Sequence, residues 1–189
     1  MNKSHFRNDF TPPKGDTEAE RLYVPADRQL ARIRAAATLI NAVGKSDSIL
    51  DVGCGFGDIV PYIDDYSNYT GIDTDKYVIE ACRTKQYLSG CSFIEAGLED
   101  VPSMTAFDMV ICLGVGSYLK KDSLEWFIKT LMASATGHLI LELHDQKKYG
   151  GFFTSFDKER VFSLCGFTPT KDNLIEHADD TTFTFRVDL

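Results

Sequence analysis

The chain lacks long hydrophobic runs and an excess of positive charge. No stretch of its 189 residues approaches the roughly 20 apolar residues needed to cross a bilayer, and residues 1–10 lack the apolar core of a signal peptide. The 20 Lys and Arg residues are outnumbered by 28 Asp and Glu residues, which gives a net charge of −8. This balance disfavours proteins that gain affinity by neutralising nucleic-acid phosphates or anionic lipids. We therefore expect neither nucleic acid nor membrane as a partner.

Paired cysteines and clustered metal ligands are also missing. The five cysteines are odd in number and dispersed, without a C-x-x-C pair, and stand at Cys54, Cys82, Cys91, Cys112 and Cys165. This pattern is typical of reduced thiols, so it predicts a cytoplasmic protein without a disulfide framework or a zinc site. His5, His138 and His177 show no ligand spacing, and we expect no metal.

The length fits one domain with a small appendage. Residues 1–25 contain Pro12, Pro13, Gly15 and many charges, and they have no apolar pattern of their own. They are predicted to form an arm, either a flexible tail or a lid that orders over a ligand. The domain proper is predicted to span residues 26–189.

Apolar patterns of two kinds alternate along that domain. Helical spacing predicts helices over 26–43, 58–65, 75–88, 122–135 and 157–165. Short apolar runs predict strands over 48–52, 69–73, 92–95, 107–113, 138–143, 167–174 and 181–187. The alternation predicts an α/β fold: a Rossmann-like, doubly wound, mostly parallel seven-stranded sheet with helices on both faces and an antiparallel C-terminal hairpin. Ligands of such sheets bind at the carboxyl ends of the strands.

A glycine loop, Asp51-Val52-Gly53-Cys54-Gly55-Phe56-Gly57, follows the first predicted strand. The dinucleotide motif G-x-G-x-x-G would need glycine where Asp58 stands, and the Gly-Lys-Ser/Thr ending of a phosphate loop is absent. Asp51 and Asp58 would repel a pyrophosphate but attract a cation. The loop therefore predicts a ligand with a positive group.

The segment resembles the motif of class I S-adenosylmethionine-dependent methyltransferases, which reads acid-x-G-x-G-x-G. The resemblance covers about residues 30–189 and implies S-adenosyl-L-methionine as the cofactor. In that family the acid and the loop hold the cationic methionyl part, and an acid ending the second strand accepts from the ribose. The cofactor residues so implied are Asp51, Gly53, Cys54, Gly55, Gly57, Asp73 and Thr74. The alternative role for Asp73 is to cap the following helix, with Thr74 and Asp75 as rival caps.

Two further segments match the family more loosely. Its acid near the adenine falls on Gly97, so Leu98 is left to pack on the purine and Glu99 to replace the missing acceptor. Alternatively, Glu99 only adds charge to a short helix start. At the end of the fourth predicted strand, the resemblance implies that Leu113 and Gly114 line the methyl-transfer cleft.

Methyl transfer depends above all on the orientation of the acceptor toward the methyl carbon, and an acidic acceptor also needs a base. His144 follows the fifth parallel strand and is the candidate base, with a surface histidine as the alternative. Tyr118 is a second candidate catalytic residue, with a packed aromatic as the alternative. The fourth strand is not followed by the Asn/Asp-Pro-Pro-Tyr/Phe clamp of amino-methylating nucleic-acid enzymes, and Cys112 lies inside that strand rather than in a Pro-Cys loop.

These features predict a methyltransferase that moves the methyl group of S-adenosylmethionine to a small-molecule acceptor by in-line displacement. A non-catalytic cofactor-binding or partner-binding protein with the same fold is the alternative. A nicotinamide dehydrogenase is a third possibility, against which the glycine spacing and Asp51 both argue.

Overall fold

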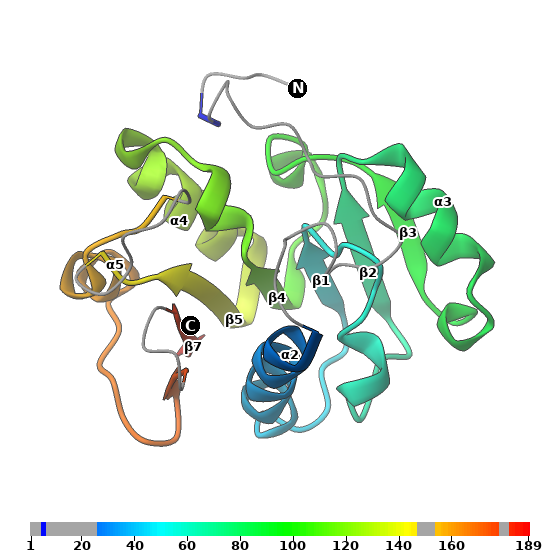
Figure 1. Cartoon of the computed structure of the whole chain (residues 1–189), viewed down its shortest axis with the longest axis horizontal. Helices are drawn as coiled ribbons and strands as arrows, with labels where there is room; N and C mark the ends of the chain where they lie inside the picture. The colour runs from blue at the N-terminus through cyan, green and yellow to red at the C-terminus, as the bar shows by residue number, and fades with distance from the viewer. Residues whose placement is uncertain (1–4, 7–25, 147–153, 178–181) are drawn as a thin grey trace.

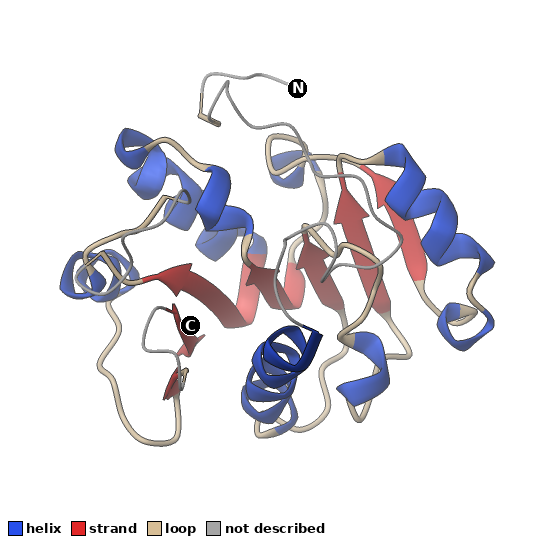
Figure 2. Ribbon diagram, in the orientation of Figure 1, coloured by secondary structure: helices blue, strands red, loops and turns tan. Residues whose placement is uncertain are grey.

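A computed structural model of the chain describes residues 5–6, 26–146, 154–177 and 182–189. Its centre is a seven-stranded sheet with the order β3-β2-β1-β4-β5-β7-β6 (Figures 1 and 2). The five parallel strands are β1 (Ile49–Val52), β2 (Tyr69–Asp73), β3 (Ser92–Glu95), β4 (Phe107–Leu113) and β5 (Ala135–His144). The last two, β6 (Leu174–Glu176) and β7 (Thr182–Asp188), are antiparallel. The predicted fold class is confirmed.

Helices cover both faces of the sheet. On one face, apolar side chains of α2 (Ala26–Asn41) and α3 (Lys76–Thr84) share one buried cluster, which also takes Met109 and Ile111 from β4. On the other face, α4 (Leu124–Ser134) and α5 (Lys158–Cys165) pack with the opposite side chains of β4, Val110 and Cys112. Figure 1 shows α2 below the sheet and α4 and α5 beyond its other side. Successive side chains of a strand therefore point alternately to the two faces of the sheet.

Two helix ends follow the local signals of the sequence. The Asp75 side chain caps α3 by accepting from the Tyr77 amide at 2.9 Å, so this acid, and not Asp73, is the cap. The helix α5 begins after Asp157, which accepts from the Arg160 amide at 2.9 Å, and ends at Gly166 with φ 60°.

The helix predicted over 58–65 is wrong. The structure has only a 3₁₀ turn there, η1 (Val60–Tyr62), and Ile63 is already extended. Pro61 cannot donate a backbone hydrogen bond, so it fits only a first turn. The Asn41 side chain then bonds the Tyr62 carbonyl at 2.9 Å and the Asp64 amide at 3.1 Å, which gives these groups partners outside a helix.

The strand predicted over 167–174 is also displaced. Residues before Leu174 form a turn in which the Thr170 amide donates to the Asn173 side chain at 2.6 Å, and pairing with β7 starts only at Leu174. The predicted arm, residues 1–25, lies outside the described residues except for His5 and Phe6. His5 stacks on Trp126 of α4, with ring centroids 3.9 Å apart.

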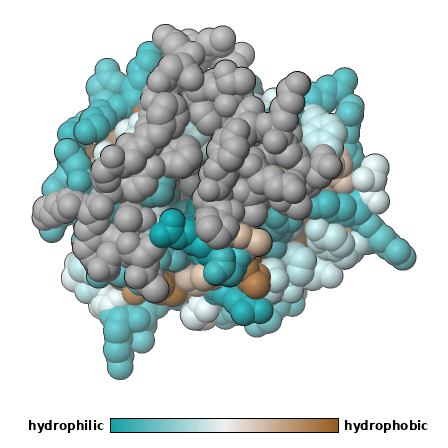
Figure 3. Space-filling model, in the orientation of Figure 1, coloured by the Kyte–Doolittle hydropathy of each residue, from teal (hydrophilic) through white to brown (hydrophobic). Residues whose placement is uncertain are grey.

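Within the described residues, no helix is both long and apolar enough to cross a membrane. Among the atoms coloured in Figure 3, hydrophilic side chains dominate the periphery of the face shown.

Candidate functional site

Residues of four parallel strands meet where these strands end. Asp51 of β1 pairs with Gly71 of β2, so Asp51 lies beside the strand that ends at Asp73. Leu113 of β4 pairs with Glu142 of β5. Alternation places these side chains on the face covered by α2. The carboxyl ends of β1, β2, β4 and β5 thus form the candidate site, as the doubly wound topology predicts.

The glycine loop crosses this edge. Gly53, Gly55 and Gly57 have φ values of 73°, 52° and 71°, a region that favours glycine. At Gly53 a Cβ atom would lie 2.2 Å from Cγ2 of Val115, so close packing also excludes a side chain. The loop therefore brings its backbone to the site in a shape that substituted residues cannot adopt.

Asp51 is a buried carboxyl group beneath the loop. Only 3 % of its surface is exposed, and it accepts a 2.5 Å hydrogen bond from the Tyr69 hydroxyl. Burial raises the pKa of Asp51 to about 7, against the lowering effect of Tyr69 and with a small further rise from Asp73. The acid is thus about half ionised at neutral pH before a ligand binds. A cationic ligand would complete its ionisation.

Asp73 connects the loop to the end of β2. Its Oδ2 accepts from the Gly55 amide at 3.2 Å, and its Oδ1 accepts from the Asp75 amide at 2.9 Å. These two bonds fix the orientation of the carboxylate. Each carboxylate oxygen has two lone pairs, so both retain capacity for a ligand hydroxyl. Thr74, beside it, is exposed.

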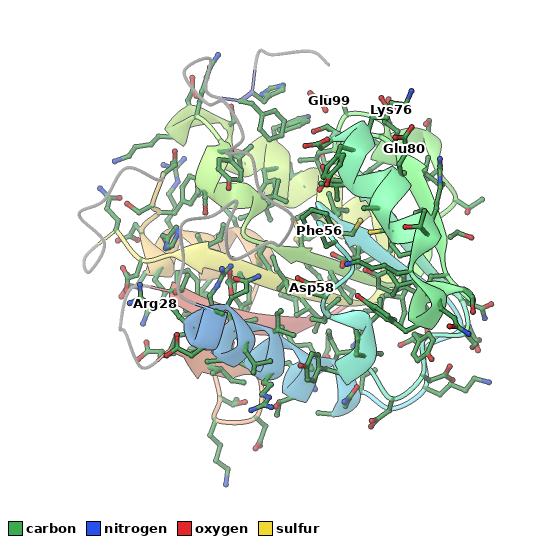
Figure 4. All side chains as sticks on the ribbon, turned by 45° about the vertical axis from the view of Figure 1, so that its right-hand side comes forward. Arg28, Phe56, Asp58, Lys76, Glu80 and Glu99 are labelled. Carbon is green, nitrogen blue, oxygen red and sulfur yellow. The ribbon has the colours of Figure 1, made fainter. Side chains whose placement is uncertain are left out.

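The segment after β3 brings Glu99 towards the same edge. A Cβ at Gly97 would lie 2.7 Å from Oε2 of Glu99 and 3.2 Å from Cγ2 of Thr74. Figure 4 shows Glu99 near the start of α3, with Phe56 and Asp58 of the glycine loop farther toward α2. The Oε1 atom of Glu99 is buried and has no hydrogen-bond partner in the described part of the chain. A ligand N–H group would satisfy this acceptor.

Leu98 packs in the hydrophobic core, unlike its neighbour Glu99. It is only 3 % exposed and belongs to the core cluster on the α4 side of the sheet. Little of its surface remains for a purine, so Glu99 is the better adenine candidate of the two. Gly97 is buried, and its amide donates to Asp100 at 2.8 Å.

A buried ion pair that the sequence analysis missed closes the other end of the site. Arg32 of α2 binds both carboxylate oxygens of Glu142, its Nε lying 3.1 and 3.2 Å from them. Glu142 is 1 % exposed; burial would raise its pKa, but Arg32 outweighs burial and the pKa is lowered. The signal was a single charge within the otherwise apolar run His138–Leu143.

A cavity connects this ion pair with the glycine loop. Its volume is about 50 Å³, and residues of the loop, α2, β4 and β5 line it. Arg32 is the one cationic side chain among its described lining residues, beside the acids Asp51, Asp58 and Glu142. The cavity can therefore accept a ligand that carries both a cation and a carboxylate.

The two candidate catalytic residues lie beside this cavity without lining it. His144 ends β5 on the same face as Glu142, is half-buried, and contributes to the lowering of the Glu142 pKa. Tyr118 ends the 3₁₀ turn η4 (Val115–Tyr118) and is half-buried. Gly114 begins that turn with φ 78°, and a Cβ there would lie 3.3 Å from Nη2 of Arg32. Neither catalytic role is tested by this geometry, and both stay predictions. Across the described ranges, no group of three His, Cys, Asp or Glu side chains is arranged to hold a metal ion.

The fold and the site define a Rossmann-like methyltransferase domain. Residues 49–136, from β1 to the start of β5, match the family model of a methyltransferase domain. Over this stretch, which includes the glycine loop and Asp73, the chain is similar to that family.

Solved structures share this fold. Magnesium protoporphyrin IX methyltransferase from Synechocystis PCC 6803 with bound S-adenosylmethionine superposes with a TM-score of 0.69 at 16% identity, over 93% of this chain and 86% of that chain. The N-methyltransferase NodS from Bradyrhizobium japonicum gives a TM-score of 0.65 at 17% identity, over 86% of this chain and 97% of that one.

A curated relative is a probable (S)-tetrahydroprotoberberine N-methyltransferase from Papaver bracteatum, 27% identical over 150 residues. The match covers 71% of this chain but only 41% of that protein.

Proposed function

We propose that the protein binds S-adenosylmethionine and transfers its methyl group to a small-molecule acceptor. The observation that carries this proposal is the arrangement of Asp51 and Asp73 around a loop with three glycines at positive φ. The named relatives support the acceptor class, since they are called methyltransferases of a porphyrin and of an alkaloid. The cytoplasm is the proposed location, since five free cysteines suit a reducing compartment.

In this proposal each end of the cofactor meets residues of matching chemistry. Asp51 faces the cationic ammonium, and Asp73 accepts hydrogen bonds from the ribose hydroxyls. Glu99 accepts from the adenine amino group with its buried Oε1. Gly53, Cys54, Gly55 and Gly57 supply the close backbone surface of the loop. Further contacts are proposed for Thr74, Gly97, Leu113 and Gly114.

The chemistry is an in-line displacement at a methyl carbon that the cofactor's sulfonium has already activated. The protein's part is to orient the acceptor and to keep water from competing with it. We place the acceptor on the side of the cavity formed by the ends of β4 and β5. His144 is the proposed proton acceptor for a phenol, thiol or ammonium group there.

The proposal is tested first by calorimetry with S-adenosylmethionine and S-adenosylhomocysteine, then by mass spectrometry on a panel of amines, phenols, thiols and carboxylic acids. Saturable binding followed by an acceptor that gains 14 mass units is the expected result. Binding without any turnover would favour the non-catalytic alternative.

Glu99→Leu is expected to weaken S-adenosylhomocysteine binding about tenfold, because one buried hydrogen bond to the adenine amino group is lost. Folding should be unaffected or improved, since Oε1 of Glu99 has no partner in the described residues. Calorimetry and thermal unfolding measure the two effects. The matched control is Glu80→Leu on the exposed side of α3, which should bind as the parent does. Equal affinities for Glu99→Leu and the parent would remove Glu99 from the site.

Arg32→Lys is expected to weaken S-adenosylhomocysteine binding five- to tenfold but to leave 5′-methylthioadenosine binding unchanged. The first ligand carries a carboxylate and the second does not, and lysine keeps the charge beside Glu142 while it loses the planar fork of donors. Competition calorimetry with the two ligands measures the difference. Equal losses for both ligands would show that Arg32 acts only through the fold.

A further inference from the structure

Two thiols from different elements meet at one atom of the glycine loop. Cys54 lies within the loop, and its Sγ is 3.6 Å from the Gly55 carbonyl oxygen. Cys82 lies on α3, and its Sγ is 3.3 Å from the same oxygen. The two thiols also hydrogen-bond to each other. Twenty-seven positions separate Gly55 from Cys82, so this contact joins the loop to a helix beyond β2.

The pKa values of the two thiols are shifted in opposite directions. The hydrogen bond with Cys54 and the charge of Lys85 lower the pKa of Cys82. The hydrogen bond with Cys82 and burial raise the pKa of Cys54 well above its usual range. Cys82 is thus the more readily ionised thiol of the two, which suits a reactive cysteine with Cys54 as its resolving partner.

Lys85, which follows α3, also contacts the loop and the residue after it. Lys85 donates to the Phe56 carbonyl at 2.7 Å and lies 3.7 Å from Asp58. Cys54 also lines the cavity of the candidate site, although it is only 7 % exposed. Cys82 is 1 % exposed and does not line the cavity, so an oxidant in the cavity meets Cys54 first and has to pass it to reach Cys82.

We propose that Cys54 and Cys82 form a reversible disulfide that closes the glycine loop to its ligand. With hydrogen peroxide as the oxidant, Cys82 gives up its thiol proton and its sulfur attacks one peroxide oxygen; the O–O bond breaks, and the leaving hydroxide takes up that proton and departs as water. The Cys54 sulfur then attacks the sulfenic sulfur of Cys82, the S–O bond breaks, and the leaving hydroxide takes the Cys54 thiol proton and departs as a second water. Two thiols are oxidised and one peroxide is reduced.

The disulfide is expected to block ligand binding because of the position at which Cys54 packs in the reduced protein. Its Sγ fills the notch beside Gly71 of β2, where a Cβ would lie 2.8 Å from the sulfur. A bond to α3 draws Cys54 out of this notch and moves the neighbouring Gly55, whose amide holds Asp73. The effect on ligand binding rests on the proposed function, whereas the disulfide itself does not.

Peptide mapping under non-reducing conditions, after peroxide treatment of the full chain, tests the bond. A Cys54–Cys82 peptide that dithiothreitol releases is expected. Cys91 is the competing thiol, and burial first and the charge of Cys82 second raise its pKa. A Cys82–Cys91 link, oxidation of Cys82 without a link, or unchanged thiols would overturn the proposal.

Calorimetry with S-adenosylhomocysteine tests closure. Oxidised protein is expected to lose at least tenfold in affinity and to regain it with dithiothreitol. Cys82→Ser should bind as the reduced parent does and ignore peroxide, whereas the control Cys91→Ser should remain sensitive. If the reduced parent binds no ligand, the proposed function fails while peptide mapping still decides on the disulfide. Unchanged affinity in a fully cross-linked sample would overturn closure.

Discussion

Replacing Gly53 with alanine is expected to weaken S-adenosylhomocysteine binding by about 100-fold or more. The added methyl group would lie 2.2 Å from the Val115 side chain, and the φ of 73° disfavours any side chain. Left-handed backbone alone costs an alanine about 1–2 kcal/mol, so the loop has to move to relieve both conflicts. Binding by calorimetry and unfolding in urea measure the two consequences.

Gly44→Ala is the matched control for this substitution. Gly44 has φ 84° but no atom within 4 Å of an added Cβ, and it lies outside the candidate site. It should lose about 1 kcal/mol of stability from backbone strain and no affinity. If Gly53→Ala binds as Gly44→Ala does, the close approach of loop and ligand is not the basis of binding.

Asp51→Asn is expected to remove a pH dependence that the parent protein shows. The Asp51 pKa is about 7 in the free protein, and a bound ammonium group would lower it. Below pH 7 the ligand must therefore displace a proton, and affinity should fall about tenfold between pH 8 and pH 6. In Asp51→Asn, affinity should be weaker and constant over this range. Calorimetry in buffers of different ionisation enthalpy would also detect the released proton in the parent.

The same substitution should stabilise the fold. The folded pKa of Asp51 lies above the value of 3.8 for an ordinary aspartate, so the folded state holds the proton more tightly than the unfolded chain. This contribution to stability is complete at low pH and is lost as the pH rises from about 4 to 7. Asparagine carries no charge to bury and can still accept from Tyr69. Thermal unfolding at pH 8 should show a higher midpoint for Asp51→Asn, and a lower one would contradict the assigned burial cost.

Most of the strands were predictable because each is a compact apolar run between turn residues. The runs at 69–73, 92–95 and 107–113 match β2, β3 and β4 residue for residue. The alternation of strands with helices also predicted that the sheet is mostly parallel. The loop and Asp73 could be assigned to one edge because the carboxyl ends of parallel strands meet there.

The incorrect and missing predictions concern residues whose structure depends on tertiary contacts and not on the local sequence pattern. Asn41 hydrogen-bonds the Tyr62 carbonyl and the Asp64 amide, where the 3₁₀ turn η1 ends, and the local sequence does not show which side chain will do so. Arg32 and Glu142 are 110 positions apart, and only the packing of α2 on β5 brings them together. Cys82 and Gly55 are 27 positions apart, and only the packing of α3 beside the glycine loop brings them together.

Binding of S-adenosylmethionine at this edge of the sheet is the centre of the proposed function. Its most direct test is calorimetry of the reduced, folded full chain with S-adenosylhomocysteine, run beside the Asp73→Ala variant. One saturable site with a dissociation constant of about 1–100 μM is expected for the parent, and at least a tenfold loss for the variant, which gives up the ribose contact. Folded parent protein that binds neither S-adenosylhomocysteine nor S-adenosylmethionine would contradict the account.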